Sequence, residues 1–140
     1  MQFNLEMDME CFTILSYSAE NVTIKHPFNK SGKAVGEIDS LKEEIQSSFI
    51  LSPKTLIKDW VPQNIQHLRK ENLEDILSLS PEVVLIGTGS KLQFPEPELM
   101  SCFWEAQIGV EIMDTAAVCR TYNILVNEGR STVAGLIIDS

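Results

Sequence analysis

Three β-prone segments in the second half of the chain, separated by two segments with helical spacing, constrain the fold most. The first, Val83–Ile86, is a continuous apolar run, and the others are Ile108–Met113 and 131–138. A continuous apolar run is typical of a strand that is buried on both faces of a sheet. The connections between these segments are long enough for helical crossovers, so the alternation predicts an α/β layer with parallel strands.

Residues that favour the start or the end of a helix flank the segments with helical spacing. Pro97 suits the first position of one helix, which we expect to run to about Gln107. Asp114 or Thr115 can cap a second helix that ends at Glu128, with Gly129 in the position after its cap. An earlier helix is predicted from an Asn72 cap to about Leu79, because Ser80-Pro81 follows.

The first half of the chain predicts short strands. Phe12–Tyr17 and Val22–Ile24 flank a polar tetrapeptide and favour a hairpin, while 34–38 and Ser47–Leu51 are further β-prone pieces. The first ten residues show no period, so we expect a flexible arm over 1–10 and one α/β domain over 11–140. A chain of 140 residues is long enough to bury a core without disulfides or metal.

The charge balance excludes several classes of partner. Eleven Lys and Arg against 20 Asp and Glu give a net charge of −9, whereas nucleic-acid binding requires a basic face. No apolar run approaches the ~20 residues of a membrane helix, so no membrane insertion is expected. The acidic N-terminal segment does not fit a secretory leader or a mitochondrial presequence, which favours the cytoplasm. The three cysteines form no CxxC pair, and this spacing favours reduced, buried thiols.

The segment Gly87-Thr88-Gly89 directly follows the predicted buried strand. Glycines there permit a sharp turn or a close backbone approach to a ligand. Leu92 replaces the third glycine of a dinucleotide fingerprint, and no Gly-Lys-Ser/Thr follows. A structural turn, a nucleotide site and a site of another kind all remain open for this loop.

Asp114 and Thr115 follow the next predicted strand. If the two strands are parallel, this pair and Gly87–Gly89 share the carboxyl edge of the sheet, where open α/β sheets bind ligands. Arg120, on the helix that follows, could hold a carboxylate or phosphate, or pair with Glu111 or Asp114. We therefore predict a crevice of Gly87, Thr88, Gly89, Asp114, Thr115 and Arg120, with helix capping as the alternative role of the Asp114-Thr115 pair.

No catalytic motif or metal set is recognised. Cys119 has no base at a related spacing, and only two histidines, His26 and His67, occur. No Gly-x-Ser-x-Gly or His-Glu-x-x-His segment is present. The sequence thus predicts no cofactor, no metal and no catalytic residue, and it leans against an enzyme.

Five segments in order carry a resemblance to a known family. They are Pro81–Gly89, Phe94-Pro95, Ile108–Thr115, Cys119–Asn123 and Glu128–Arg130, within about 40% of the chain. Together they resemble the family of mitochondrial respiratory complex I assembly factor 3 and its uncharacterised bacterial and archaeal relatives. The resemblance implies a three-layer α/β domain around a mixed, largely buried β-sheet, with helices on its faces and a small extra hairpin from the N-terminal part. It implies no established enzymatic activity.

Two functions follow as hypotheses. The first is a non-catalytic protein-binding or assembly module, whose partners would include respiratory-complex subunits. The second is a binding protein or enzyme for a small anion or carboxylate, using the predicted crevice. An exposed apolar patch would favour the first, and a well-formed polar pocket the second.

Overall fold

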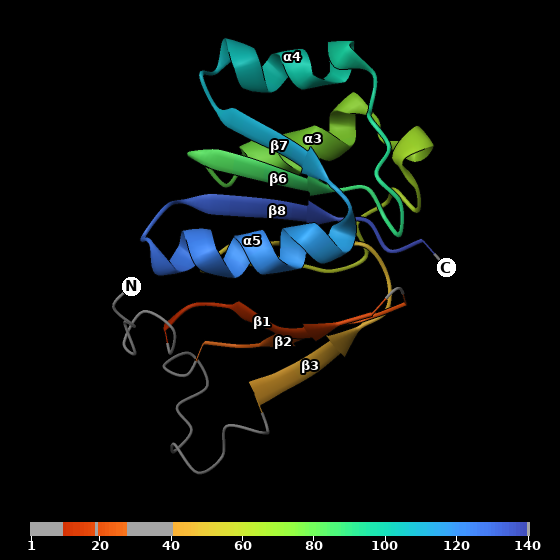
Figure 1. Cartoon of the computed structure of the whole chain (residues 1–140). Helices are drawn as coiled ribbons and strands as arrows, with labels where there is room; N and C mark the ends of the chain where they lie inside the picture. The colour runs from red at the N-terminus through yellow and green to blue at the C-terminus, as the bar shows by residue number, and fades with distance from the viewer. Residues whose placement is uncertain (1–9, 19, 28–40, 140) are drawn as a thin grey trace.

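The computed structural model describes residues 10–18, 20–27 and 41–139, and its centre is a five-stranded mixed sheet (Figure 1). The strand order is β5-β4-β8-β6-β7. Strand β6 pairs in parallel with both β7 and β8, whereas β4 pairs antiparallel with β8 and β5. The prediction that the three C-terminal strands share one sheet is confirmed. The bounds are β4 Phe49–Leu51, β5 Leu56–Ile57, β6 Val83–Gly87, β7 Gly109–Met113 and β8 Thr132–Leu136.

The interior strand β6 is buried on both faces, as its apolar run predicts. Leu85 points into a core cluster that contains Val118 and Tyr122, while Val84 and Ile86 point into a second cluster on the opposite face. Alternate side chains of a strand point to opposite faces, so a strand covered on both sides must be apolar throughout. The sequence of β6 satisfies this requirement at every position.

Helices cover both faces of this sheet. The helices α3 (Lys70–Leu77) and α4 (Pro97–Glu105) supply side chains to the cluster around Val84, together with the short 3₁₀-helix η2 (Ile65–His67). Helix α5 (Thr115–Asn127) packs on the other face through Val118 and Tyr122. This is the three-layer α/β arrangement that was expected.

The caps of two helices test the sequence interpretation. Asp114 caps α5 by accepting from the Ala117 amide at 2.8 Å, as predicted. The predicted Asn72 cap of α3 is wrong. The cap residue is Arg69, and the Asn72 side chain accepts from the Arg69 amide at 2.8 Å from a position inside the first turn. A side-chain acceptor three residues into a helix serves the cap amide in a capping box, which explains the offset.

A second, three-stranded antiparallel sheet lies against α5, which is therefore located between the two sheets (Figure 1). Its strands are β1 (Thr13–Tyr17), β2 (Val22–Lys25) and β3 (Lys42–Ile45). The predicted β1–β2 hairpin is confirmed, and β3 extends it to a sheet. The strand expected over 34–38 lies outside the described residues. The division into an arm over 1–10 and a domain over 11–140 stays a prediction.

Side chains of α5 bind the small sheet directly. Asn123 Oδ1 accepts from the Ile14 amide at 2.9 Å, and Asn123 Nδ2 donates to the Ile14 carbonyl at 2.7 Å. The buried Tyr122 hydroxyl donates to the Phe12 carbonyl at 2.9 Å. Asn123 thus pairs with the edge of β1 as a neighbouring strand would, and it satisfies backbone groups that would otherwise lack partners.

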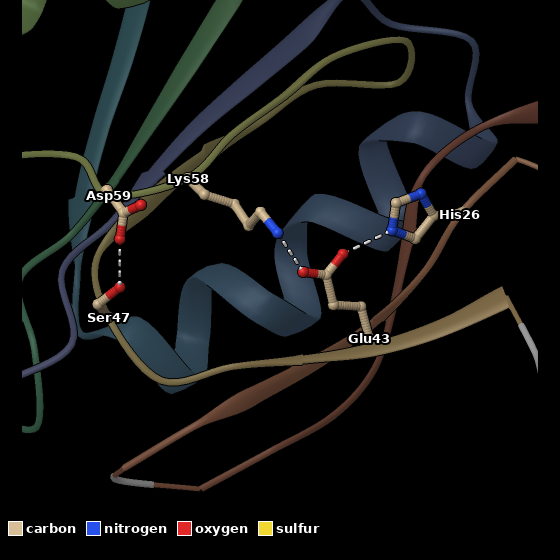
Figure 2. A network of polar contacts seen from close by, with 5 residues as sticks. All are labelled: His26, Glu43, Ser47, Lys58 and Asp59. Carbon is tan, nitrogen blue, oxygen red and sulfur yellow. Dashed lines mark hydrogen bonds and ion pairs between the residues drawn. The ribbon is translucent and has the colours of Figure 1, made fainter.

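A polar network joins the other side of the small sheet to the chain after β5 (Figure 2). Glu43 on β3 lies 2.7 Å from His26 Nε2 through one oxygen and 2.7 Å from Lys58 Nζ through the other. Hydrogen bonding from Lys58, and then from His26, lowers the pKa of Glu43. The Ser47 hydroxyl donates to Asp59 at 3.4 Å beside this network. These contacts stabilise the relative position of the two sheets.

Candidate functional site at the carboxyl edge of the central sheet

The carboxyl ends of β6, β7 and β8 meet at one edge, because all three strands are parallel and in register. Gly87 lies opposite Met113 on one side and Leu136 on the other. The Thr88 amide donates to the Met113 carbonyl at 2.9 Å, and the Thr115 amide donates to the Gly89 carbonyl at 2.9 Å. The structure therefore brings Gly87–Gly89 and Asp114–Thr115 together, as the parallel-strand argument predicts.

The Thr115 hydroxyl joins the segments that meet at this edge through two hydrogen bonds. It accepts from the Gly89 amide at 2.9 Å and donates to the Ile137 carbonyl at 2.7 Å, and both bonds are buried. A Cβ on Gly87 would lie 2.9 Å from the same oxygen, which leaves no room for a side chain there. Thr115 thus connects the segments that follow β6 and β8 to the start of α5.

The loop after Gly87 uses its amides within the protein. The Gly89 amide is bound by Thr115, and the Ser90 amide donates to Asp139 Oδ1 at 2.9 Å. Gly89 has a φ of +101°, and a Cβ on it would collide with the Asp139 carboxylate, so glycine is required. From the sequence we expected this loop to expose amides that could hold an anion. In the structure these two amides face protein acceptors.

A cavity of about 220 Å³ opens beside this loop. Gly89, Asp114 and Thr115 line it together with Tyr17, which comes from β1 in the small sheet. The Arg120 guanidinium donates to the Tyr17 hydroxyl at 2.8 Å rather than pairing with Glu111 or Asp114. Arg120 therefore reaches the cavity wall through Tyr17. Binding of a ligand by Gly87, Thr88, Gly89, Asp114, Thr115 and Arg120 stays a prediction.

Cys119 lies on α5 but does not present a reactive thiol. It is 1% exposed, and burial raises its pKa to about 12. The thiolate is the nucleophilic form of cysteine, so this thiol is inert at neutral pH. Within 10–18, 20–27 and 41–139, no three His, Cys, Asp or Glu side chains come close enough to hold a metal ion.

A larger groove of about 620 Å³ lies at the same edge, between the loop that follows Gly89 and the start of α3. Phe94 in that loop is 73% exposed, and Leu92 is 50% exposed. The Gln66 side chain of η2 donates to Gln93 Oε1 at 3.1 Å and joins the two walls. The sequence analysis did not include this groove in the candidate site. Phe94-Pro95 next to the glycine loop is the signal that could have indicated it.

None of the helices in the described part of the chain is long and apolar enough to span a membrane.

The architecture and the glycine loop at the carboxyl edge together define a class of small mixed α/β proteins. A Xanthomonas campestris protein solved by NMR is 28% identical and has a TM-score of 0.74 over 99% of this chain and 92% of its own. A Bordetella pertussis protein, described as a Mth938-like domain, has a TM-score of 0.70 at 22% identity, over 100% of this chain and 91% of its own. These structures establish the fold.

The chain belongs to the family described as protein of unknown function (DUF498/DUF598), whose model matches residues 31–137. A Francisella tularensis relative, named 13 kDa major membrane protein, is 41% identical over 49% of this chain and 55% of its own length. The mouse NADH dehydrogenase [ubiquinone] 1 alpha subcomplex assembly factor 3 is 34% identical over 63% of this chain and 48% of its own. The chain therefore spans about half the length of these two curated relatives, and it is homologous to the complex I assembly factors.

Proposed function

We propose that this chain is a non-catalytic module that binds protein partners during the assembly of a membrane-bound respiratory complex. The observation that carries the proposal is its 34% identity to the mouse assembly factor over 63% of the chain. The partners would be subunits of the respiratory complex, which the chain would reach from the cytoplasm.

The arrangement of the carboxyl edge supports recognition rather than chemistry. Thr115, Asp114 and the Gly89 amide are occupied by hydrogen bonds that hold the edge together. Large apolar side chains are instead exposed nearby, with Phe94 at 73%. A contiguous exposed apolar patch rimmed by polar residues marks an interaction site, and Leu92 and Phe94 would belong to one.

Electrostatics give the proposal a measurable consequence. With a net charge of −9, the protein as a whole attracts basic partner segments. Exposed charges are screened beyond roughly 8–10 Å at physiological ionic strength, so such binding should weaken as salt rises.

A deletion strain of the host tests the assembly role. Membranes from the deletion, and from strains complemented with wild type or with Arg120→Ala, are scored for assembled NADH dehydrogenase on native gels. We expect less assembled complex in the deletion and restoration by wild type, and fractionation of the same cells tests the location. Normal assembly in the deletion, together with turnover of a metabolite by the purified protein, contradicts the proposal.

Ligand binding in the 220 Å³ cavity is the second candidate function, since Tyr17 lines the cavity and the Arg120 guanidinium donates to the Tyr17 hydroxyl. The ligand would be a small anion or carboxylate, because a guanidinium binds both. NMR titration with phosphate and with acetate tests it. Saturable shifts around Gly89 and Tyr17 that disappear in Arg120→Ala would support this function, and unchanged spectra would exclude it for these probes.

A further inference from the structure

We propose that a cavity at the amino ends of β6 and β8 binds a small carboxylate that carries a short apolar chain. This inference goes beyond the proposed assembly role, and the cavity lies at the opposite edge of the sheet from the candidate site. The amino-edge cavity has a volume of about 320 Å³ and is enclosed by the β4–β5 turn, the end of α5 and the start of β8. Small-molecule sites commonly measure roughly 300–1,000 Å³, so this volume suits a small ligand.

The charge of the lining selects an anion. Two basic side chains, Lys54 and Arg130, line the amino-edge cavity, and no Asp or Glu of the described residues does. The whole chain has 20 acidic against 11 basic residues, so a lining whose charges are all positive departs from its composition. Charge complementarity between a site and its ligand favours the correct ligand and disfavours one of like charge.

Both cations retain hydrogen-bond donors for a ligand. Arg130 Nε contacts Glu82 at 3.4 Å, and its two Nη groups make no hydrogen bond within the described part of the chain. Lys54 Nζ donates to the Glu10 carbonyl at 3.2 Å, which leaves two of its three N–H groups. A guanidinium binds a carboxylate through two parallel hydrogen bonds. Because Glu82 already contacts one of the two cations, a ligand with a single negative charge fits best.

The inner surface of the cavity selects an apolar chain. Most of the surface that a ligand would touch there is apolar. Pro53 in the β4–β5 turn and Leu79 after α3 are partly exposed and contribute to it. The lining continues into the core through Val126 and Val133, which are each 1% exposed. A ligand with an alkyl chain removes this apolar surface from water, whereas a bare anion leaves it wet.

The walls of the cavity are ordered by backbone hydrogen bonds. The Ser52 amide donates to the Thr55 carbonyl at 2.8 Å and closes the β4–β5 turn. At the end of α5, the Gly129 amide donates to the Val126 carbonyl at 2.9 Å, with Gly129 at a φ of +78°. These bonds satisfy carbonyls at the helix end that would otherwise disfavour an anion, and ordered walls lose less conformational entropy on binding.

Titration of the full chain with octanoate, followed through the backbone amides by NMR, tests the site. We expect saturable shifts at the amides of Thr55, Gly129 and Val133, and none at Gly89, which lines the 220 Å³ cavity at the other edge. Acetate is the matched probe without the chain, and octylamine has the same chain with the opposite charge. Each should bind at least about tenfold more weakly, because acetate buries no methylene groups and octylamine brings a like charge to the lining.

Removal of the two cations then tests their role. The double variant Lys54→Gln/Arg130→Gln should bind octanoate about tenfold more weakly, because hydrogen bonds from charged donors are lost. Both side chains are exposed, so we expect the variant to fold, and its amide spectrum checks this. The matched control is Lys70→Gln/Lys91→Gln, which removes the same charge from exposed positions outside the lining. It should bind octanoate as wild type does.

Each outcome decides the inference. Saturable octanoate binding that the double variant weakens and the control variant keeps supports the site. Equal binding of octylamine shows apolar association alone, and equal binding of acetate shows that the chain adds nothing, so either result overturns it. Unchanged spectra with octanoate, or shifts that both double variants retain, also overturn it. The assembly role is tested separately by the deletion strain, and neither result depends on the other.

Discussion

Replacing Thr115 by valine is the sharpest perturbation of the carboxyl edge. Valine has nearly the shape of threonine, so the change removes the hydroxyl and little else. The Gly89 amide and the Ile137 carbonyl both lose their partner, and both bonds are buried. We expect a folded but destabilised protein, because a buried polar group without a partner lowers the free energy of unfolding.

The size of the effect follows from counting these two groups. Each unsatisfied buried group costs about 1–3 kcal/mol, so Thr115→Val should lower the free energy of unfolding by about 2–6 kcal/mol. For a chain of this length that corresponds to a fall in Tm of roughly 6–18 °C. Urea unfolding followed by the fluorescence of the buried Trp60 measures the difference, provided that the denaturant slope is unchanged.

Thr115→Ser is the control, since serine keeps the hydroxyl and loses only a methyl group. We expect it to retain most of the stability that Thr115→Val loses. If the valine variant is within about 0.5 kcal/mol of wild type, the magnitude that separates neutral substitutions from structural ones, the hydroxyl is not structural. Equal losses in the serine and valine variants would also refute the argument, because they would implicate packing instead.

Three further predictions concern the contact of α5 with the small sheet, the Glu43 network and the α5 thiol. Asn123→Ala should lower stability by about 1–3 kcal/mol and speed amide exchange at Ile14, measured by NMR, because both backbone groups of Ile14 lose their partner. The pKa of Glu43 is lowered in the folded state, so its contacts stabilise above the unfolded value of ~4.3 and are lost as the pH falls through the folded value. Urea unfolding at several pH values should thus show Glu43→Gln less stable by up to about 1 kcal/mol at pH 7, with the gap closing below about pH 4. A thiol reagent at neutral pH should leave Cys119 unmodified in the native protein and modify it only after unfolding, because burial raises its pKa to about 12; mass spectrometry of the peptides checks this.

The elements that the sequence predicts well are those whose signals are local. Strand β6 is a continuous apolar run, and α5 has a cap signal at both ends, Asp114 and Gly129. The approach of Gly87–Gly89 to Thr115 also follows, because two parallel neighbouring strands in register place their carboxyl ends together. The rule that parallel neighbouring strands end at the same edge of a sheet, combined with the patterns of the two strands, was sufficient to predict this contact.

The contacts that the sequence does not indicate are long-range. Asn123 binds Ile14, 109 residues away, and Arg120 binds Tyr17, 103 residues away. Strand β3 carries Lys42, Glu43 and Glu44, a charged pattern that is atypical of a strand. It forms because it pairs with β2 and because Glu43 finds its partners outside the strand. The spacing of residues along the chain reveals neither these long-range contacts nor the pairing of β3 with β2.

The contacts also divide the segments that resemble the assembly-factor family into two kinds. Gly89, Thr115 and Asn123 make hydrogen bonds that hold the fold together, so any protein with this architecture can require them whatever it does. Phe94 differs, because it is 73% exposed and an exposed phenylalanine adds nothing to a core. A resemblance at Gly89, Thr115 or Asn123 is evidence of a shared fold. A resemblance at Phe94 is evidence of a shared surface. The function of this chain is therefore best sought by substitutions in the Leu92–Pro95 loop, where loss of partner binding without loss of stability separates recognition from folding.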